Sequence, residues 1–556
     1  MTFTAAVADQ RFVLDHVVGI DDLARDDRFA AASPDVVDAV LEGIAQFAAG
    51  EWAPLNRAGD TVGARWTPDG VVMPEGYRDA YRAYVEGGWG TIGVPEQFGG
   101  QGLPFVIQAA VLETLGTANM GFALAPILSV GAIEALQHHG TPEQQATYLP
   151  KLATGEWTGT MNLTEPQAGS DVGALRTTAT PLGDGRFAIK GTKIYISFGD
   201  HDLTDNIVHL VLARTPGAPA GTRGISLFLV PKMRLDGTPN DVRVVSIEHK
   251  MGLHASPTCV LSFGDHDDCI GELIGPEFGG MRAMFTMMNN ARLNVGLQGV
   301  QVAEAATQKA AAYARERVQG ARNGQAAAIV EHADVRRMLL RMKAQTMAAR
   351  ALVYYACGMV DRAGLGDEKA RERLEIMTPL AKAHATDLGN EVASIGIQVH
   401  GGMGYVEETG AAQFFRDARI TPIYEGTNGI QAADLVGRKL SMANGGAFSD
   451  LIADMRAAAR HPRLITLIDA CAAVGRRLQG AESDDRQAAS YPFLTMLSVA
   501  ACGWLMERQA AADGADIVKR TAATFYLDQI VPEALGLEDA ANAPASALYA
   551  LPADAF

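Results

Sequence analysis

The feature that most restricts the fold is a change of sequence pattern near Trp157 and a second change near Gly279. Between them lie five short segments rich in β-branched residues and separated by Gly, Pro, Asp and Asn: 185–197, 206–215, 223–232, 241–250 and 258–267. Several short strands with turn signals between them predict an antiparallel barrel or sandwich, and not a domain of alternating strands and helices.

Helical patterns flank this central block. Residues 35–52 repeat apolar side chains three and four positions apart, and Thr141, Pro142 and Glu143 form a typical helix start. After Gly279 the helical pattern returns, and residues 333–360 carry a buried stripe that includes Met338 and Met342. Such length is typical of long antiparallel helices in a bundle.

The fold class is therefore α+β. A break rich in Gly and Ser at 441–450 precedes a last helical region, 451–530. The domains that we expect are an N-terminal extension (1–35), an N-terminal α-helical domain (36–157), a middle β domain (158–275), a C-terminal helical bundle of four helices (276–445) and a C-terminal helical extension (446–556).

Charge and composition exclude several classes of function. The net charge is −17, which argues against binding to nucleic acid or to an anionic membrane. No apolar run reaches the ~18 residues of a membrane span, and no secretory signal is visible at the start of the sequence. The five cysteines contain no C-x-x-C pair, so neither a disulfide framework nor a metal site is indicated. We expect a cytoplasmic protein.

Three motifs carry the chemistry. They are Met161–Asp171 (MNLTEPQAGSD), Gly191–Ser197 (GTKIYIS) and the segment 397–431, which contains GGMG and Tyr424-Glu425-Gly426-Thr427. Each is ordinary in isolation, because a lone Glu before Gly is usually a solvated loop residue and paired glycines are usually only a tight turn. Their combination, order and spacing resemble the acyl-CoA dehydrogenase family over about residues 36 to 440.

The resemblance implies an FAD-dependent oxidoreductase that acts on CH–CH groups in fatty acid β-oxidation. Glu425 would abstract the C2 proton of an acyl-CoA thioester, and flavin N5 would accept hydride from C3. Some members carry the base just before an Arg that corresponds to Arg292, but Ala291 stands there in this sequence. We therefore expect Glu425 to be the base, with a pKa raised by burial.

The same resemblance assigns the ligand contacts. Residues expected to bind FAD are Met161, Leu163, Thr164, Gly169, Ser170, Tyr195, Ser197, Arg317, Gln398, Gly401, Gly402 and Thr427. Residues expected to bind the substrate are Ser170, Asn289, Arg292 and Gly426. Two of these have plainer interpretations, since Tyr195 could be buried only for packing and Arg317 could be a surface residue of a helix. We interpret His400 as structural.

The resemblance also bears on partners and alternatives. The KMGLHASPTC (250–259) and MMNNARLNVGLQGV (287–300) blocks and the two extensions resemble the long bacterial branch of the family, which includes 3-methylmercaptopropionyl-CoA and long-chain acyl-CoA dehydrogenases. Arg317 would reach the FAD of a neighbouring subunit, which implies a homodimer or a dimer of dimers. The expected electron acceptor is electron-transferring flavoprotein. An oxidase that uses oxygen and a non-catalytic assembly factor remain alternatives.

Overall fold

Contacts divide the chain into two compact units, which we call the sheet unit and the bundle unit. The sheet unit contains Glu42–Leu103 and Thr114–Ala291; the bundle unit contains the chain up to Leu41, Pro104–Glu113 and Arg292–Phe556. The computed structural model describes residues 3–556, except for the side chains of residues 285–289. The expected domain boundaries are finer than this division and stay a prediction.

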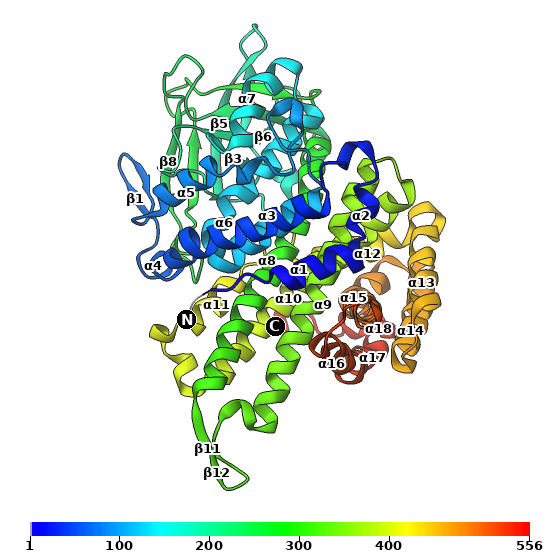
Figure 1. The fold of residues 1–556 in the computed structure, drawn as a ribbon. Helices are drawn as coiled ribbons and strands as arrows, with labels where there is room; N and C mark the ends of the chain where they lie inside the picture. Colours follow the sequence, from blue (N-terminus) through cyan, green and yellow to red (C-terminus); the bar gives the residue numbers. More distant parts are fainter. Residues whose placement is uncertain (1–2) are drawn as a thin grey trace. The chain divides into compact units, whose positions relative to one another are not determined.

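An eight-stranded sheet forms the centre of the sheet unit (Figure 1). The order is β3-β6-β7-β10-β5-β9-β8, with β4 beside β5. The strands are β3 (Thr158–Asn162), β4 (Thr178–Pro181), β5 (Arg186–Ser197), β6 (Ile207–Ala213), β7 (Ser226–Pro231), β8 (Val242–Ile247), β9 (Thr258–Phe263) and β10 (Ile270–Ile274). The five predicted strands are confirmed. The sequence analysis missed β3, β4 and β10, which are short and border turns.

Pairing in the sheet is antiparallel with one exception. Strand β3 runs parallel to β6, so that Thr158 pairs with Ile207 and Asn162 with Val211. Every residue of β6 is buried, as expected for a strand covered on both faces. The parallel pair places the first predicted flavin motif, which begins in β3, directly beside this buried strand.

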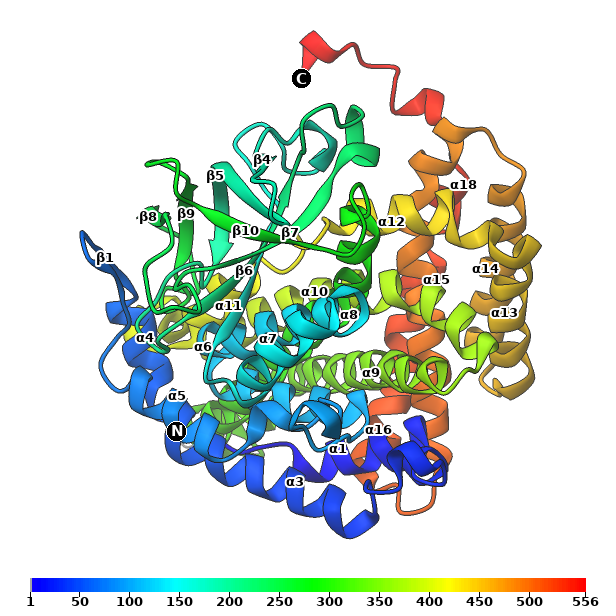
Figure 2. The same cartoon turned by 90° about the horizontal axis from the view of Figure 1, so that it is seen from above.

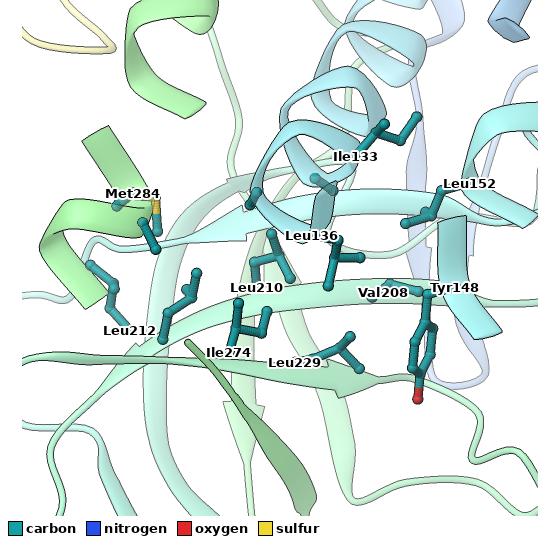
Figure 3. Close-up of a cluster of buried hydrophobic side chains, with 14 of the residues drawn as sticks. Ile133, Leu136, Tyr148, Leu152, Val208, Leu210, Leu212, Leu229, Ile274 and Met284 are labelled. Carbon is teal, nitrogen blue, oxygen red and sulfur yellow. The ribbon is translucent and has the colours of Figure 1, made fainter. Parts of the chain in front are cut away.

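Two helices cover one face of the sheet. In the sheet unit, α6 (Phe105–His139), from Thr114 onward, and α7 (Pro142–Thr154) contribute Leu136 and Leu152 to a buried cluster with Leu210 and Leu229 of the strands (Figure 3). The predicted start of α7 is confirmed, since the Thr141 hydroxyl accepts a hydrogen bond from the Gln144 backbone N–H and closes a capping box. Burial of these aliphatic side chains is the main force that holds the layers together.

The remaining helices of the N-terminal region are α3 (Pro34–Phe47), α4 (Asn56–Val62) and α5 (Tyr77–Glu86). A small antiparallel hairpin, β1 (Arg65–Thr67) and β2 (Gly70–Val72), interrupts the helical pattern that the sequence predicts. Its turn contains Pro68 and Asp69, and β2 begins at Gly70, which has φ +130°. These residue types favour a turn, so a local signal existed for this hairpin.

A buried ion pair joins the first two predicted motifs. Lys193 of β5 donates to the Glu165 carboxylate (2.9 Å) and to the Leu163 carbonyl (3.1 Å). The same carboxylate accepts from the Thr177 hydroxyl at 2.6 Å and from the Arg176 backbone N–H at 2.7 Å. Burial by itself would raise the pKa of Glu165, but Lys193 and these hydrogen bonds lower it to about 2. The turn after β3 is therefore fixed to the strand that carries the second motif.

The bundle unit is built on three long helices: α8 (Gly280–Glu316), from Arg292 onward, α9 (Ala333–Gly364) and α10 (Glu368–His400). Helices α8 and α10 approach closely at glycines, because a Cβ on Gly299 would lie 2.1 Å from the Ala385 carbonyl oxygen. The predicted stripe on α9 is confirmed, with Met338 and Met342 buried. Shorter helices α11 (Ala411–Ala418) and α12 (Asn428–Gly437) follow.

An exposed hairpin separates α8 from α9. Its strands are β11 (Val318–Arg322) and β12 (Gln325–Ala328), and the sequence analysis did not predict them. Every residue of β11 is exposed, so the segment lacks the alternation of apolar and polar residues by which a strand is recognised.

The C-terminal extension is helical, as predicted, and packs against the bundle. Its helices are α13 (Gly446–Ala458), α14 (Pro462–Gln479), α15 (Ser483–Ala511), α16 (Ile517–Phe525), α17 (Val531–Leu535) and α18 (Glu538–Asn542). Figure 2 shows α13 and α14 alongside α15, and α15 contacts α9, α10 and α12. The extension is thus continuous with the bundle core.

The N-terminal extension is fixed to both the bundle and the C-terminal extension. It begins with α1 (Val7–Val13) and α2 (Ile20–Leu23). The Asp9 carboxylate of α1 accepts from Lys343 of α9 (2.9 Å) and from Lys519 of α16 (3.2 Å). Burial opposes ionisation of Asp9, but Lys343, Arg350 and Lys519 hold its pKa well below the usual range.

Among the residues that the structure describes, two helices are long and apolar enough, by length and composition, to cross a membrane: α6 and α15. In each case most of the apolar window is buried within protein, 89% in α6 and 83% in α15. Core helices have the same composition, so we assign both helices to the core.

The Glu165–Lys193 pair makes a stability prediction. Lys193→Met should destabilise the protein by about 3–5 kcal/mol, because it leaves a buried carboxylate without its cation. The Glu165 contribution is present above the carboxyl pKa of the unfolded chain and is lost as the pH falls towards about 2. The difference in the free energy of unfolding between the wild type and Lys193→Met should therefore be smaller at acidic pH. Urea midpoints at neutral and acidic pH measure both effects.

Lys190→Met is the matched control. Lys190 lies in the same strand and pairs with Asp267 at 2.6 Å, but both side chains are exposed. Its loss should leave the urea midpoint nearly unchanged. Equal losses in the two variants would contradict a special role for the buried pair.

Candidate functional site

Glu425 lies in a short loop between α11 and α12 whose backbone has an unusual conformation. Glu425 has φ +54° and Gly426 has φ +83°, so two consecutive residues occupy the left-handed region. For a non-glycine residue this conformation is uncommon and must be held by surrounding contacts. The Asn428 backbone N–H donates to the Pro422 carbonyl (2.9 Å) and closes the loop.

Thr427 ends the loop and starts the next helix. Its hydroxyl accepts from the Ile430 backbone N–H at 3.1 Å, which caps the N-terminus of α12. Thr427, expected to bind FAD, therefore has a structural contact of its own.

Glycine is favoured at position 426, because its φ of +83° strains any other residue. An added Cβ would also lie 2.9 Å from Gln431 Nε2, so that this side chain would have to shift. The same Cβ position lies 4.0 Å from Arg292 Nη2. Two of the four residues expected to bind substrate, Arg292 and Gly426, are thus brought together beside Glu425.

Two cations set the electrostatics of Glu425. Removal from water raises the pKa of the Glu425 carboxyl, whereas Arg292 of α8 and Lys382 of α10 act to lower it. The pKa of Lys382 is lowered to about 8 because its ammonium is buried, although Glu425 and Asp387 oppose that shift. The Glu425 carboxylate is thus partly withdrawn from water, and the rise in its pKa from desolvation is opposed by attraction to the two cations.

Lys382 also holds the loop directly. Its side chain is fully buried, and its ammonium donates to Asn428 Oδ1 at 2.9 Å. Sequence reasoning missed Lys382. The available signal was a lysine within the otherwise apolar segment PLAKA (379–383), since a charged residue is unusual on a buried helix face.

Several buried polar atoms around this loop have no hydrogen-bond partner among the described residues: Arg292 Nε, Gln298 Nε2 and Gln431 Oε1. The Tyr424 hydroxyl donates to Gln298 Oε1, so only the amide nitrogen of Gln298 is left over. Unsatisfied buried groups are costly, and these three atoms could form hydrogen bonds with a polar ligand bound beside Glu425. Gln298 and Gln431 were not predicted.

In the sheet unit, the predicted flavin contacts lie at the end of β3 and on β5. Met161, Leu163 and Thr164 are partly exposed, and Gly169 and Ser170 are exposed. The Ile194 backbone N–H donates to the Thr164 carbonyl at 3.0 Å, which joins the two motifs by their backbones. Among the described atoms, none lies within 4 Å of a Cβ built on Gly169, so this turn leaves open space.

Tyr195 stands out of the sheet. The register of β5 against β9 shifts between Lys193 and Ile196, and Tyr195 within this bulge has φ +59°. Its side chain is 60% exposed, whereas packing alone would have buried it. Ser197, at the end of β5, is half-buried. Bulges often redirect a side chain beside a functional site, and an exposed ring suits stacking on a planar ligand.

The other predicted flavin contacts lie in the bundle unit. Arg317 is exposed between α8 and β11, Gln398 is exposed on α10, and Gly401 and Gly402 are exposed just after it. His400 is buried and stacks on Tyr313, with ring centroids 4.4 Å apart. Burial lowers the pKa of His400, and Nδ1 hydrogen-bonds the Gly396 carbonyl at 2.7 Å, which agrees with a structural role.

Asn289, expected to bind substrate, lies outside the residues whose side chains are described. Within the described part of the chain, no group of three His, Cys, Asp or Glu side chains could hold a metal ion.

Family models match almost the whole chain. The models are the acyl-CoA dehydrogenase N-terminal domain (residues 36–156), middle domain (160–266) and C-terminal domain (279–440), followed by an "acetyl-CoA dehydrogenase C-terminal like" model (441–552). The last match covers the C-terminal extension, which is therefore a recognised part of some family members.

Individual relatives agree with these models. The chain is 45% identical to a 3-methylmercaptopropionyl-CoA dehydrogenase of Ruegeria pomeroyi, over 95% of this chain and 94% of the relative. It is 35% identical to a butyryl-CoA dehydrogenase of Syntrophomonas wolfei, over 90% of each. The solved structure of an acyl-CoA dehydrogenase complexed with FAD from Bacillus anthracis shares the fold, with a TM-score of 0.75 and 23% identity over 97% of this chain and 91% of that one. The chain belongs to the acyl-CoA dehydrogenase family of oxidoreductases.

Proposed function

We propose that this protein introduces the α,β-double bond into an acyl-CoA thioester, with Glu425 as the base that removes the C2 proton. The observation that carries the proposal is the state of Glu425 itself. It is held at φ +54°, its pKa is raised by burial, and Arg292 and Lys382 supply the nearby charges. A carboxylate in such a setting suits abstraction of a weakly acidic C–H proton.

The proton transfer depends on the balance of charges around Glu425. Desolvation makes the carboxylate a stronger base than one in water, while Arg292 and Lys382 favour its ionised form and oppose that rise in pKa. After transfer, the proton resides on a Glu425 carboxyl oxygen. The thioester carbonyl must be polarised for the C2 proton to leave, and we assign that task to the Glu425 backbone N–H. Gly426, which has no side chain, leaves room for the acyl chain beside Glu425.

The residues that would hold FAD fit such a group. The exposed ring of Tyr195 suits contact with the isoalloxazine, and the open turn at Gly169 and Ser170 suits a phosphate. Arg317 is exposed and carries the forked donors that bind a pyrophosphate. When bound, FAD supplies the acceptor for the two electrons that leave the substrate. The relative from Bacillus anthracis, which has the same fold, was solved with FAD.

The wider assignment rests on the resemblance and on the relatives. We propose that the enzyme acts in the cytoplasm in β-oxidation, as a homodimer or dimer of dimers, and passes electrons to electron-transferring flavoprotein. Relatives named for 3-methylmercaptopropionyl-CoA and butyryl-CoA favour a short acyl chain. Anaerobic titration of the protein with these two thioesters and a long-chain acyl-CoA, followed by flavin absorbance, tests the substrate class. Peroxide release in air would instead favour the oxidase.

Glu425→Gln should keep FAD but lose the reaction, because the amide has no basic oxygen. We expect the variant to purify yellow and to retain less than about 5% of the wild-type rate of flavin bleaching by butyryl-CoA or 3-methylmercaptopropionyl-CoA. Glu408→Gln, at an exposed glutamate earlier in the same segment, is the matched control and should bleach at the wild-type rate. A bleaching rate near wild type in Glu425→Gln would refute the assignment of the base.

The pH dependence follows from the raised pKa of Glu425. The base must be ionised, so kcat/KM should fall as the pH decreases through that pKa. Because burial raises it, the acidic limb should lie above the pKa of an ordinary solvated carboxyl. A pH profile of flavin reduction measures the limb. If the acidic limb of kcat/KM instead lies at the pKa of an ordinary solvated carboxyl group, the base is exposed to water and this prediction is wrong.

Arg317→Ala should lower FAD content, because it removes the proposed pyrophosphate contact. The ratio of flavin to protein absorbance in the purified variant measures the occupancy. Arg315→Ala removes another exposed arginine near the end of the same helix and should leave the ratio unchanged. Equal FAD content in the two variants would remove Arg317 from the cofactor site.

A further inference from the structure

A residue of the C-terminal extension reaches the hydrogen bonds that hold the Glu425 loop. The Tyr491 hydroxyl, on α15, donates to Asp387 Oδ2 on α10 at 2.6 Å. The other oxygen of the same carboxylate, Oδ1, accepts from Asn428 Nδ2 at 2.8 Å. Asn428 lies three residues after Glu425. Tyr491, Asp387 and Asn428 therefore form one continuous chain of hydrogen bonds from the extension to the loop.

Asn428 is the point at which this chain meets the loop. Besides Asp387, its amide nitrogen has the Ala383 carbonyl (3.1 Å) and the Thr386 hydroxyl (3.0 Å) within hydrogen-bond distance, and these two acceptors share its second N–H. Its amide oxygen accepts from the Lys382 ammonium at 2.9 Å. The side chain is buried with its hydrogen bonds satisfied, and its backbone N–H closes the loop onto Pro422. A fully satisfied buried amide specifies one position for the backbone that carries it.

Packing follows the same path as the hydrogen bonds. Helix α12, which begins at Asn428, packs against α15 of the extension. A Cβ on Gly437, at the end of α12, would be 3.8 Å from Gln487 Nε2 of α15. The extension thus contacts the helix that starts directly after the loop, in addition to the hydrogen bond that Tyr491 makes to α10.

We propose that the C-terminal extension is part of the catalytic apparatus: Tyr491, acting through Asp387, Asn428 and Lys382, positions Glu425 and sets its charge. The inference rests on the proposed function of Glu425 as the base. Tyr491, Asp387, Asn428 and Lys382 are positioning residues, since none is assigned a contact with substrate. The extension would then have a role besides covering the bundle.

The charges along this path are linked in a definite direction. Arg292 and Lys382 face Glu425, and Glu425, Asp387 and Arg292 face Lys382. Burial raises the pKa of Asp387, while Tyr491, Asn428, Lys382 and Arg419 act to lower it. Loss of the Tyr491 hydroxyl should therefore make Asp387 easier to protonate. A neutral Asp387 no longer supports the charge on Lys382, and a neutral Lys382 no longer lowers the pKa of Glu425.

The test is Tyr491→Phe in the full-length, FAD-loaded protein. Butyryl-CoA and 3-methylmercaptopropionyl-CoA are the probes, and the rate of flavin bleaching is measured from about pH 5 to about pH 9. We expect the maximal rate to fall by about fivefold with little change in the apparent affinity for the thioester. We also expect the acidic limb to move to higher pH by about half a unit. A purely structural loss would lower the amount of active enzyme without moving the limb.

The matched control is Asp454→Asn. Asp454 lies on α13 of the extension and accepts from Arg373 of α10 at 2.7 Å, so this variant also removes a polar contact between the extension and α10. The bond between Asp454 and Arg373 does not involve Asp387 or Asn428. The pH profile of Asp454→Asn should therefore match that of the wild type. Lys382→Met should move the acidic limb in the same direction as Tyr491→Phe and by a larger amount.

The outcomes separate the inference from the proposed function. If the wild type bleaches with neither probe nor any longer acyl-CoA, the proposed function fails and the inference fails with it. If the wild type is active and Glu425→Gln is inactive, but Tyr491→Phe has the wild-type rate and limb, only the inference is overturned. If Tyr491→Phe loses FAD or thermal stability, Asp387→Asn is the substitute test, because it removes the charge of the carboxylate between Tyr491 and Asn428. The acidic limb of Asp387→Asn must then lie at higher pH than that of the wild type. If it does not, the inference is rejected.

Discussion

The hydrogen bond from the Lys382 ammonium to the Asn428 side chain is the contact on which the geometry of the site depends. It joins the middle of α10 to the first residue of α12 at 2.9 Å, and the loop that contains Glu425 is closed by the backbone of the same asparagine. Burying an ammonium is costly unless it is well paired, and the lowered pKa of Lys382 expresses that cost. The contact stabilises the left-handed backbone conformations of Glu425 and Gly426, which an unrestrained loop would not keep.

The two cations beside Glu425 come from different helices, so helices α8 and α10 must be close together. Glycine provides the space, since a side chain on Gly296 or Gly299 of α8 would overlap the backbone of α10. The close crossing brings Arg292 from one helix and Lys382 from the other to the same carboxylate. The charge environment of Glu425 is therefore a consequence of helix packing, and not of residues adjacent to it in the chain.

Two glutamates in this protein show how surroundings decide between a structural and a reactive carboxylate. Glu165 accepts hydrogen bonds from Lys193, Thr177 and backbone N–H groups, and its pKa is lowered to about 2. A carboxylate so fully satisfied is a weak base, and it serves to fix a turn. Glu425 has a raised pKa and lies beside buried polar atoms that lack partners among the described residues. Of these two glutamates, Glu425 is the one whose surroundings favour taking up a proton.

The sequence by itself determined the order of helices, sheet and bundle, five of the strands, the helix start at Thr141 and the motif that contains Glu425. These are local features, because periodicity, capping and short motifs are all expressed within a few neighbouring residues. The tertiary structure decided the parallel pairing of β3 with β6, the outward position of Tyr195, and the grouping of Lys382, Asp387 and Tyr491 behind the loop. Tyr491 lies 104 positions from Asp387. No local pattern reports such a contact, since it exists only after the apolar faces of α10, α12 and α15 have packed against one another.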